Sequence, residues 1–149
     1  MKYYLAYGSN LSVDQMRYLC PDAKIVGKAT LHDYKLVFRI HATVEPEFGN
    51  SVPVLIWRIS DADEARLDRY EGFPKYYIKQ DFTVDVTSLR TGRVKQLTAM
   101  GYVMSIGRDI IPPSPDYYCT ILEGYKRFGF DTQVLRDAYS DAFIGEPAI

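Results

Sequence analysis

Alternating hydrophobic and polar residues mark a long strand region in the first third of the chain. Over residues 24–40 the pattern is that of half-buried strands, with aromatic and aliphatic side chains at every second position near its end. Polar residues near 31–33 predict a break in this region. Residues 44–51 contain a proline and a glycine, which favour a loop or hairpin over a continuing strand.

Three further segments have strand patterns. Residues 52–59 are almost wholly apolar, which predicts a central strand covered on both faces. Pro53 within this segment indicates the beginning of the strand or a bulge, because proline cannot donate a ladder hydrogen bond. Residues 76–86 and 94–106 are predicted as two more strands, joined by a polar turn at residues 91–92.

Capping-box spacing marks the start of two helices. Ser12 with Gln15, and Ser60 with Asp63, place a hydroxyl three residues before a side chain that can return to the cap. Apolar residues then recur at helical spacing in both segments. The first helix is expected to end at a proline, and the second at residue 71, where Gly72 stops it.

Two more helices follow near the end of the chain. Ser114 caps a long helix that has Pro115 in its first turn and ends at Gly129. Its predicted buried stripe is Tyr118, Ile121, Leu122, Tyr125 and Phe128. Asp131 is expected to cap a last helix, and the chain from Phe143 onward is expected to be loose.

Length and charge restrict the class of protein. The 149 residues are enough for one domain with a sizeable core, and we predict a single α+β domain over residues 1–149 with a mostly antiparallel sheet. Eighteen basic and nineteen acidic residues leave almost no net charge, which argues against a nucleic-acid partner. The sequence has no apolar run long enough to cross a membrane and no signal-peptide pattern, so a cytoplasmic location is expected.

Cysteine and histidine are scarce. Cys20 and Cys119 are too few and too far apart to predict a disulfide framework. His32 and His41 are the only histidines, so no spacing resembles a zinc site and a histidine-based triad is not expected. Any catalytic chemistry in this chain must therefore depend on carboxylates, tyrosines and backbone dipoles. The sequence contains thirteen tyrosines.

The stretch Tyr7-Gly8-Ser9-Asn10-Leu11 lies between a short apolar strand and the first helix. Gly8 has no side chain to keep a ligand away from the backbone, and Ser and Asn are common turn formers. A strand, a tight turn and a helix start direct amide protons at an anion. The same pattern also fits an ordinary strand-to-helix turn.

Glu71 is a carboxylate in an unfavourable position. It lies in the last turn of its helix, where a negative charge opposes the helix dipole by roughly 0.3–1 kcal/mol when exposed. It also shares a face with Leu67, which favours partial burial and a raised pKa suited to general acid–base chemistry. The alternative is a surface ion pair with Arg69, Lys75 or Lys79. Asp68 lies on another face and is expected to be solvated.

Three motifs, in this order, resemble the γ-glutamylcyclotransferase-like family. They are Tyr7-Gly8-Ser9-Asn10-Leu11, Leu67-Asp68-x-x-Glu71-Gly72, and Pro113-Ser114-x-x-Tyr117 ahead of the long C-terminal helix. The match extends over about residues 3 to 130. Each motif alone is weak, and their order and spacing give the resemblance its specificity.

The resemblance implies a fold, a reaction and a site. The fold is a small, closed or nearly closed β-barrel with helices around it, and its cavity lies between the turn at residues 7–11 and the helix end that carries Glu71. In the family, the α-amine of a γ-glutamyl compound attacks its own γ-carbonyl, which releases 5-oxoproline and an amine without a cofactor or metal. Glu71 then corresponds to the general acid–base.

The same resemblance implies substrate-binding residues. Tyr7, Gly8, Ser9, Asn10 and Leu11 would bind the substrate, with the turn facing either its α-carboxylate or the developing oxyanion. Tyr117 corresponds to a substrate-contacting tyrosine, with Tyr102 as a weaker candidate, and either can instead be a core aromatic residue. Tyr70 is bulky and is expected to narrow the entrance.

Three functions remain open at this point. The first is a cyclotransferase acting on γ-glutamyl amino acids or a related small conjugate. The second is a tailoring enzyme that removes a γ-glutamyl group from a larger amine. The third is a non-catalytic module that binds a small anion, although a carboxylate at residue 71 would disfavour that ligand. The expected partner is a small γ-glutamyl molecule, with no nucleic acid or membrane, and the protein is expected to be a monomer or homodimer.

Overall fold

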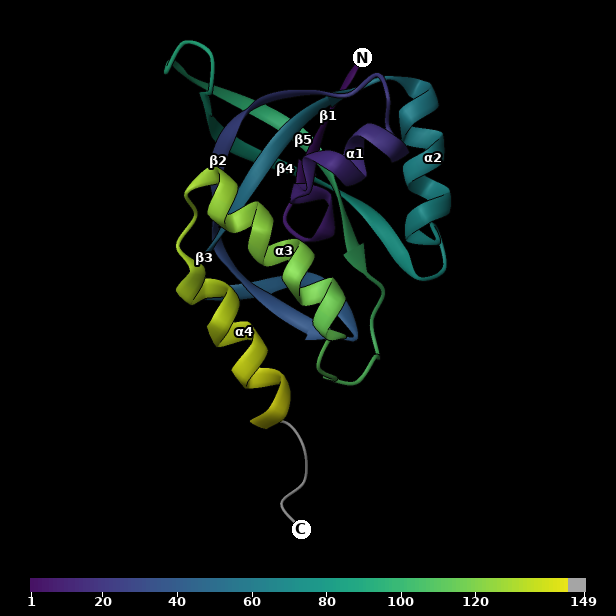
Figure 1. Cartoon of the computed structure of the whole chain (residues 1–149), viewed down its shortest axis with the longest axis vertical. Helices are drawn as coiled ribbons and strands as arrows, with labels where there is room; N and C mark the ends of the chain where they lie inside the picture. The colour runs from purple at the N-terminus through teal and green to yellow at the C-terminus, as the bar shows by residue number, and fades with distance from the viewer. Residues whose placement is uncertain (145–149) are drawn as a thin grey trace.

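Residues 1–144 are the part of the chain that the computed structural model describes, and their five strands form a closed barrel (Figure 1). The strands are β1 (Lys2–Ala6), β2 (Lys24–Arg39), β3 (His41–Ile59), β4 (Tyr77–Ser88) and β5 (Val94–Met104). The helices are α1 (Val13–Leu19), α2 (Asp61–Glu71), α3 (Pro115–Phe128) and α4 (Thr132–Ile144), and a 3₁₀ turn, η1 (Ser9–Leu11), lies between β1 and α1.

The strand order around the barrel is β1-β3-β2-β4-β5. Neighbouring strands are antiparallel, except for β1 and β5, which run parallel where they close the barrel. These features confirm the predicted α+β fold: a small, mixed, mostly antiparallel barrel with surrounding helices.

The long β2–β3 hairpin overturns two expectations. β2 is not broken near residues 31–33: the register shifts between His32 and Tyr34, where Asp33 adopts a φ of 62°, and the strand continues beyond this irregularity. β3 continues through residues 44–51, which were expected to form a loop or hairpin, but residues 47–50 have no partner in β2 and form a bulge opposite Asp33. Pro46 there pairs with Tyr34, so pairing with β2 outweighs the local turn signals.

Residues 52–59 form the predicted central strand segment within β3, and all their apolar side chains except Pro53 are buried. Pro53 pairs with Thr30 inside the strand, so its placement at a strand start or bulge was wrong. β1 pairs with β3 only from Leu55 onward, which leaves Pro53 with a strand neighbour on one side. The turn after β4 is confirmed, with Gly92 at a φ of 73°.

The predicted caps of the first two helices are confirmed. Ser12 Oγ accepts a hydrogen bond from the Gln15 backbone N–H at 3.2 Å, and Ser60 and Asp63 form a complete capping box. Gly72 ends α2 in the left-handed region, with a φ of 66°. α2 therefore ends at Glu71, as predicted.

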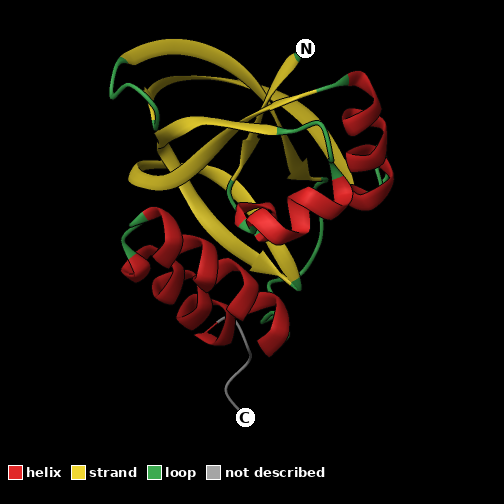
Figure 2. Ribbon diagram, turned by 45° about the horizontal axis from the view of Figure 1, so that its top comes forward, coloured by secondary structure: helices red, strands yellow, loops and turns green. Residues whose placement is uncertain are grey.

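The last two helices lie side by side against the barrel (Figure 2). Ser114 caps α3, Pro115 lies in its first turn and Gly129 ends it, as predicted. Asp131 Oδ1 accepts a hydrogen bond from the Gln133 N–H at 3.0 Å at the start of α4. α4 continues through Phe143, so the expectation of loose chain from that residue was wrong there, and residues 145–149 lie outside the described part.

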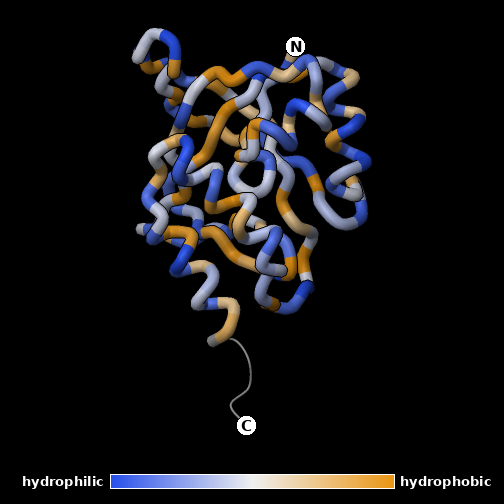
Figure 3. Tube along the Cα trace, viewed as in Figure 1, coloured by the Kyte–Doolittle hydropathy of each residue, from blue (hydrophilic) through white to orange (hydrophobic). Residues whose placement is uncertain are grey.

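The core lies inside the barrel and beneath the helices. Figure 3 shows hydrophobic residues concentrated along the strands, and Leu5, Phe38, Ile56 and Leu67 are fully buried. Ile121 of α3 is also fully buried, which fixes this helix on the barrel. Among the described residues, no helix has the length and apolar character needed to span a membrane.

Candidate active site

The turn after β1 presents unpaired backbone amides. The Leu11 N–H donates to the Gly8 carbonyl and the Ser12 N–H to the Ser9 carbonyl, both at 3.0 Å. Within residues 1–144, the N–H groups of Gly8, Ser9 and Asn10 have no acceptor. These three donors can face a negatively charged oxygen of a ligand.

Two adjoining compartments lie beside this turn. We call them the inner cavity, of about 20 Å³, and the outer pocket, of about 340 Å³. Both are lined by Ser9, Glu71, Tyr77 and Tyr117. The inner cavity is completed by Tyr4, Tyr7, Gly8, Asn10, Ala42 and Tyr102, and the outer pocket by His41, Arg69, Tyr70, Gly72 and Tyr76.

Most of the predicted site residues therefore meet at one place, between the turn and the end of α2. These residues are Glu71, Tyr7, Gly8, Ser9, Asn10 and Tyr117, with Tyr102 beside them. Leu11 is the exception, because its side chain is fully buried away from both compartments and packs against Gly124 of α3. Leu11 thus anchors the turn to α3, and it brings no group to the cavity.

Glu71 is largely buried and lacks a compensating charge. Among the described residues, no cation lies within 4.0 Å of its carboxylate, and no donor forms a hydrogen bond to it. Burial raises its pKa from 4.5 to about 7. A carboxyl group with this pKa exchanges protons readily near neutral pH.

The surface ion pair considered as the alternative for Glu71 does not form. Lys79 Nζ instead contacts Glu64 at 3.0 Å and Asp68 at 2.9 Å. Asp68 also accepts a hydrogen bond of 2.6 Å from the Tyr102 hydroxyl. Asp68 is therefore half-buried and doubly bonded, and the expectation that it is solvated was wrong.

Five tyrosines line the inner cavity: Tyr102 donates its proton to Asp68, and two of the other four donate theirs to backbone carbonyls. Tyr7 donates to the Tyr102 carbonyl, and Tyr77 donates to the Ala42 carbonyl, each at 2.6 Å. Burial raises the pKa of both phenols, and the nearby Glu71 carboxylate raises it further. Both hydroxyls are therefore neutral near pH 7.

The other two tyrosines accept hydrogen bonds. The Tyr117 hydroxyl oxygen accepts from the Ala42 N–H at 3.1 Å, and the Tyr4 hydroxyl oxygen accepts from Asn10 Nδ2 at 2.8 Å. Within the described chain, neither of these phenols has an acceptor for its own proton. Burial also raises the pKa of both phenols.

Several site residues were missed from the sequence. Tyr4 and Tyr77 lie in strands, where an aromatic residue is more simply explained as core. Gln15 was recognised only for its cap spacing, yet its side chain bonds to Ser9, Asn10 and Tyr70. The abundance of tyrosine in the sequence was the only signal that could have indicated Tyr4 and Tyr77.

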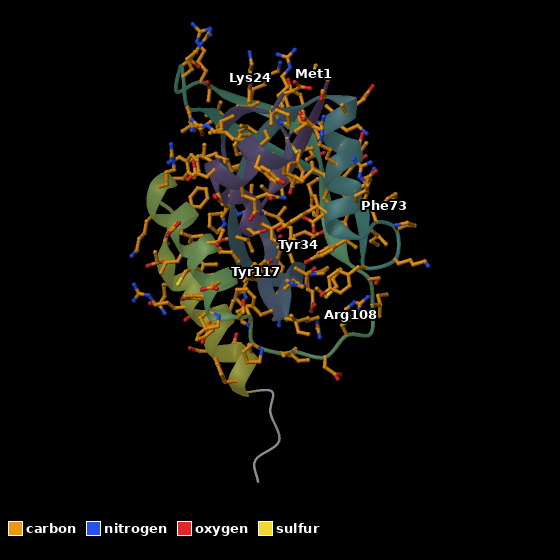
Figure 4. The ribbon with its side chains drawn as sticks, turned by 45° about the vertical axis from the view of Figure 1, so that its right-hand side comes forward. Met1, Lys24, Tyr34, Phe73, Arg108 and Tyr117 are labelled. Atoms are coloured by element: carbon orange, nitrogen blue, oxygen red, sulfur yellow. The ribbon has the colours of Figure 1, made fainter. Side chains whose placement is uncertain are left out.

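An aromatic wall closes the outer pocket. His41 Nδ1 is 2.8 Å from the Tyr76 hydroxyl, and the His41 ring meets the Tyr117 ring edge to face at 5.1 Å. The Arg108 guanidinium lies 4.1 Å from the centre of the Tyr76 ring; Figure 4 labels Arg108, on the loop before α3, and Tyr117. Burial lowers the pKa of His41, which favours its neutral form. Tyr70 is half exposed at the same pocket, consistent with the expected narrowing.

In the described part of the chain, no three His, Cys, Asp or Glu side chains come close enough to hold a metal ion. What the site does contain is one buried carboxyl group, several hydrogen-bond donors and several phenol oxygens around a small cavity. This set can move a proton and bind negative charge.

Known proteins share these features over most of the chain. Residues 4–119 match a family model described as gamma-glutamyl cyclotransferase, AIG2-like. Gamma-glutamylcyclotransferases of Mus musculus and Bos taurus are 32% and 30% identical to this chain over 139 residues, covering 85% of this chain and 71% of each relative. A solved structure named gamma-glutamyl cyclotransferase is 27% identical and superposes with a TM-score of 0.75, covering 92% of this chain and 85% of its own. The chain belongs to the gamma-glutamyl cyclotransferase, AIG2-like family.

Proposed function

We propose that this protein is a γ-glutamyl cyclotransferase, which converts a γ-glutamyl amino acid or a related γ-glutamyl conjugate to 5-oxoproline and a free amine. One observation supports this proposal above the others. Glu71, the carboxyl group of the family motif, is largely buried without an ion pair beside the amide-rich turn, and its pKa is about 7. A structural or anion-binding role would not require an uncompensated acid at this position.

The proposed reaction begins with a proton transfer. The substrate α-amine is a cation at neutral pH and must lose a proton before it can attack. Glu71 accepts this proton, and the nitrogen then forms a bond to the γ-carbonyl carbon within the same molecule. Because both reacting groups belong to one bound substrate, much of the catalysis lies in holding a folded conformer.

The second half of the reaction returns the proton. Glu71 delivers its proton to the departing nitrogen, the attacking nitrogen gives up its second proton, and the tetrahedral intermediate collapses as the bond from the γ-carbon to the departing nitrogen breaks. The α-nitrogen has then lost two protons, and the departing amine has gained two and leaves as an ammonium ion. The sum is one C–N bond formed and one broken, with no water consumed. One carboxyl group thus acts first as base and then as acid.

Hydrogen-bond donors surround the space where negative charge must lie. The N–H groups of Gly8, Ser9 and Asn10 and the hydroxyls of Tyr4 and Tyr117 are unsatisfied among the described residues. We propose that these groups bind the substrate α-carboxylate and the developing oxyanion. Donors that are fixed before the reaction stabilise such charge without reorganising.

The test is a labelled incubation. Purified protein is mixed with γ-glutamyl-alanine in H₂¹⁸O, and 5-oxoproline and glutamate are measured by mass spectrometry. We expect unlabelled 5-oxoproline, and we expect no product from the same compound acetylated on its α-amine. Labelled glutamate, or turnover of the acetylated compound at a comparable rate, would contradict cyclisation and indicate hydrolysis.

A larger leaving amine is the second candidate. The outer pocket adjoins Glu71 and reaches Arg69 and Tyr70, so the departing group would extend through it. Its volume of about 340 Å³ is at the small end for ligand sites, which are typically about 300–1,000 Å³, and this favours an amine of amino-acid size. Comparing kcat/KM for γ-glutamyl-alanine and for a γ-glutamyl aminoglycoside separates the two candidates.

We also propose a cytoplasmic location and a monomer or homodimer. Cys20 is buried and Cys119 is exposed, and neither forms a disulfide, which fits a reducing compartment. Fractionation of the source cells and light scattering on the purified protein test these two points.

A further inference from the structure

Five tyrosines line the inner cavity. Tyr102 donates to Asp68, which does not line the cavity, and the other four fall into two groups by the direction of their hydrogen bonds. Tyr7 and Tyr77 donate their protons to backbone carbonyls, so each presents lone pairs to the cavity. Tyr4 and Tyr117 accept hydrogen bonds instead, so each keeps a proton to donate. The cavity therefore has an accepting side, suited to an ammonium group, and a donating side, suited to an oxygen that gains negative charge.

The direction at Tyr4 is set by Asn10, which lines the cavity, and by Gln15, which lies outside it. Gln15 Nε2 donates to Asn10 Oδ1 at 2.8 Å, which leaves the Asn10 amide group to face Tyr4. Asn10 Nδ2 then donates to the Tyr4 hydroxyl oxygen, also at 2.8 Å. An amide has one accepting and one donating end, so the orientation of Gln15 sets the orientation of Asn10 and, in turn, of the Tyr4 proton.

Two hydroxyl groups also contact the Gln15 amide nitrogen, which has two hydrogens and so donates to Asn10 and to one of them. Gln15 Nε2 lies 3.0 Å from Ser9 Oγ and 3.1 Å from the Tyr70 hydroxyl. Gln15 belongs to α1 and lines neither compartment, whereas Tyr70 belongs to α2 and neighbours Glu71. One amide nitrogen thus joins the turn to the helix that carries the acid.

We infer that Gln15 is a positioning residue, which acts through Asn10 to hold the Tyr4 hydroxyl as a donor to the substrate γ-carbonyl oxygen. This inference rests on the proposed cyclotransferase function. Glu71 must reach both nitrogens bonded to the γ-carbon, and Tyr4 and Glu71 line the same inner cavity. A donor in that place faces the oxygen that becomes charged in the tetrahedral intermediate.

Reversal of the hydrogen-bond chain should disable the Tyr4 donor without removing it. In Gln15→Glu the new carboxylate can only accept, so Asn10 must turn its amide nitrogen toward residue 15 and its oxygen toward Tyr4. Tyr4 then donates to Asn10 and presents a lone pair to the substrate oxygen. We expect kcat to fall by about 10²–10³-fold, the usual loss for one oxyanion donor, with a smaller change in KM.

The controls separate direction from charge and from packing. Gln15→Leu removes the hydrogen bond from residue 15 to Asn10 without reversing its direction. This variant should lose less activity than Gln15→Glu. Tyr4→Phe should lose about as much as Gln15→Glu, and adding Gln15→Glu to Tyr4→Phe should cost little more. A simple electrostatic effect of the new charge on Glu71 would persist in the Tyr4→Phe background, and a shift of the pH profile would reveal it. If Gln15→Glu does not fold, Asn10→Asp reverses the same chain from its middle.

The outcomes are distinct. Kcat at the wild-type level in Gln15→Glu, or a loss that adds fully to that of Tyr4→Phe, would overturn the positioning role and leave the cyclotransferase function intact. Absence of 5-oxoproline release by the wild-type protein, in the same assay, would overturn the proposed function and this inference together. A reduced kcat with wild-type thermal stability and a non-additive double variant is the result we expect.

Discussion

At the residue scale, Glu71 is defined by what surrounds it. Its carboxyl group is largely buried at the end of α2, and no cation within the described residues compensates it. Lys79, one of the three cations considered as its partner, is held by Glu64 and Asp68. Desolvation without compensation stabilises the protonated acid, which explains a pKa of about 7.

This pKa predicts the pH dependence of catalysis. The free enzyme must hold Glu71 as a carboxylate to accept the substrate proton, so kcat/KM should rise with pH through an acid limb centred near 7. Initial rates of 5-oxoproline release between pH 5 and 9 measure this limb. A kcat/KM that stays flat down to pH 5, as expected for an ordinary glutamate pKa of 4.5, would show that Glu71 is solvated in the free enzyme.

Gly8 offers a second test at this scale. A Cβ at this position would lie 3.4 Å from Ala42 Cβ and 3.6 Å from the Tyr117 hydroxyl oxygen, which are ordinary contact distances. Gly8→Ala should therefore fold and keep much of its activity. The additional methyl groups in Gly8→Val have to enter the inner cavity, and we expect KM to rise by at least about tenfold, or 1.4 kcal/mol, with little change in the melting temperature.

Steady-state kinetics and thermal unfolding of the two Gly8 variants check this prediction. Normal KM in Gly8→Val would mean that the substrate does not approach the turn.

At the scale of secondary-structure elements, the site depends on how α3 meets η1. A Cβ on Gly124 would lie 2.5 Å from Leu11 Cβ and 3.2 Å from the Leu11 carbonyl atoms, so only glycine permits this approach. Gly124→Ala should push α3 away from the turn and displace Tyr117. We expect a loss of about 1–3 kcal/mol in unfolding free energy, together with a loss of activity.

Cys119→Ala is the matched control for this variant, because Cys119 is exposed on the same helix. It should leave stability and turnover unchanged. Wild-type stability of Gly124→Ala in chemical denaturation would contradict the close packing of α3 on the turn.

The elements also show where sequence patterns suffice. The helix caps at Ser12, Ser60 and Ser114 were predictable because each is a local interaction within three residues. The break near residues 31–33 and the loop at 44–51 were wrong, because β2 and β3 pair on both sides of the bulge formed by Asp33 and residues 47–50. Local turn signals cannot reveal a partner that lies at a distance along the chain.

At the scale of the whole molecule, closure of the barrel assembles the site. Tyr4 comes from β1, Ala42 from β3, Tyr77 from β4 and Tyr102 from β5, and all four line the inner cavity. The motif residues Glu71 and Tyr117 were predictable, since the resemblance carries them in order along the sequence. The four strand residues were not predictable as a group, because only the strand order brings them together. Tyr102 alone was a weak candidate from the sequence.

The buried acid also affects global stability. Raising the folded-state pKa of Glu71 from 4.5 to about 7 means that the folded protein binds this proton more tightly than the unfolded chain. Stability from this group is fully present below pH 4.5 and is lost as the pH rises through 7, with a total change of roughly 3 kcal/mol. Glu71→Gln should therefore gain stability over the wild type at pH 8 and differ little from it at pH 4.5.

The release of 5-oxoproline by Glu71→Gln tests the central claim most directly. Glutamine has nearly the same size as glutamate but cannot transfer the proton, so turnover at pH 8 should fall by about 10²–10⁴-fold. Thermal unfolding of the same preparation should show a melting temperature equal to or above that of the wild type, as expected for an acid kept at a cost in stability. A Gln variant that is active and less stable than the wild type would contradict the account and assign Glu71 a structural role.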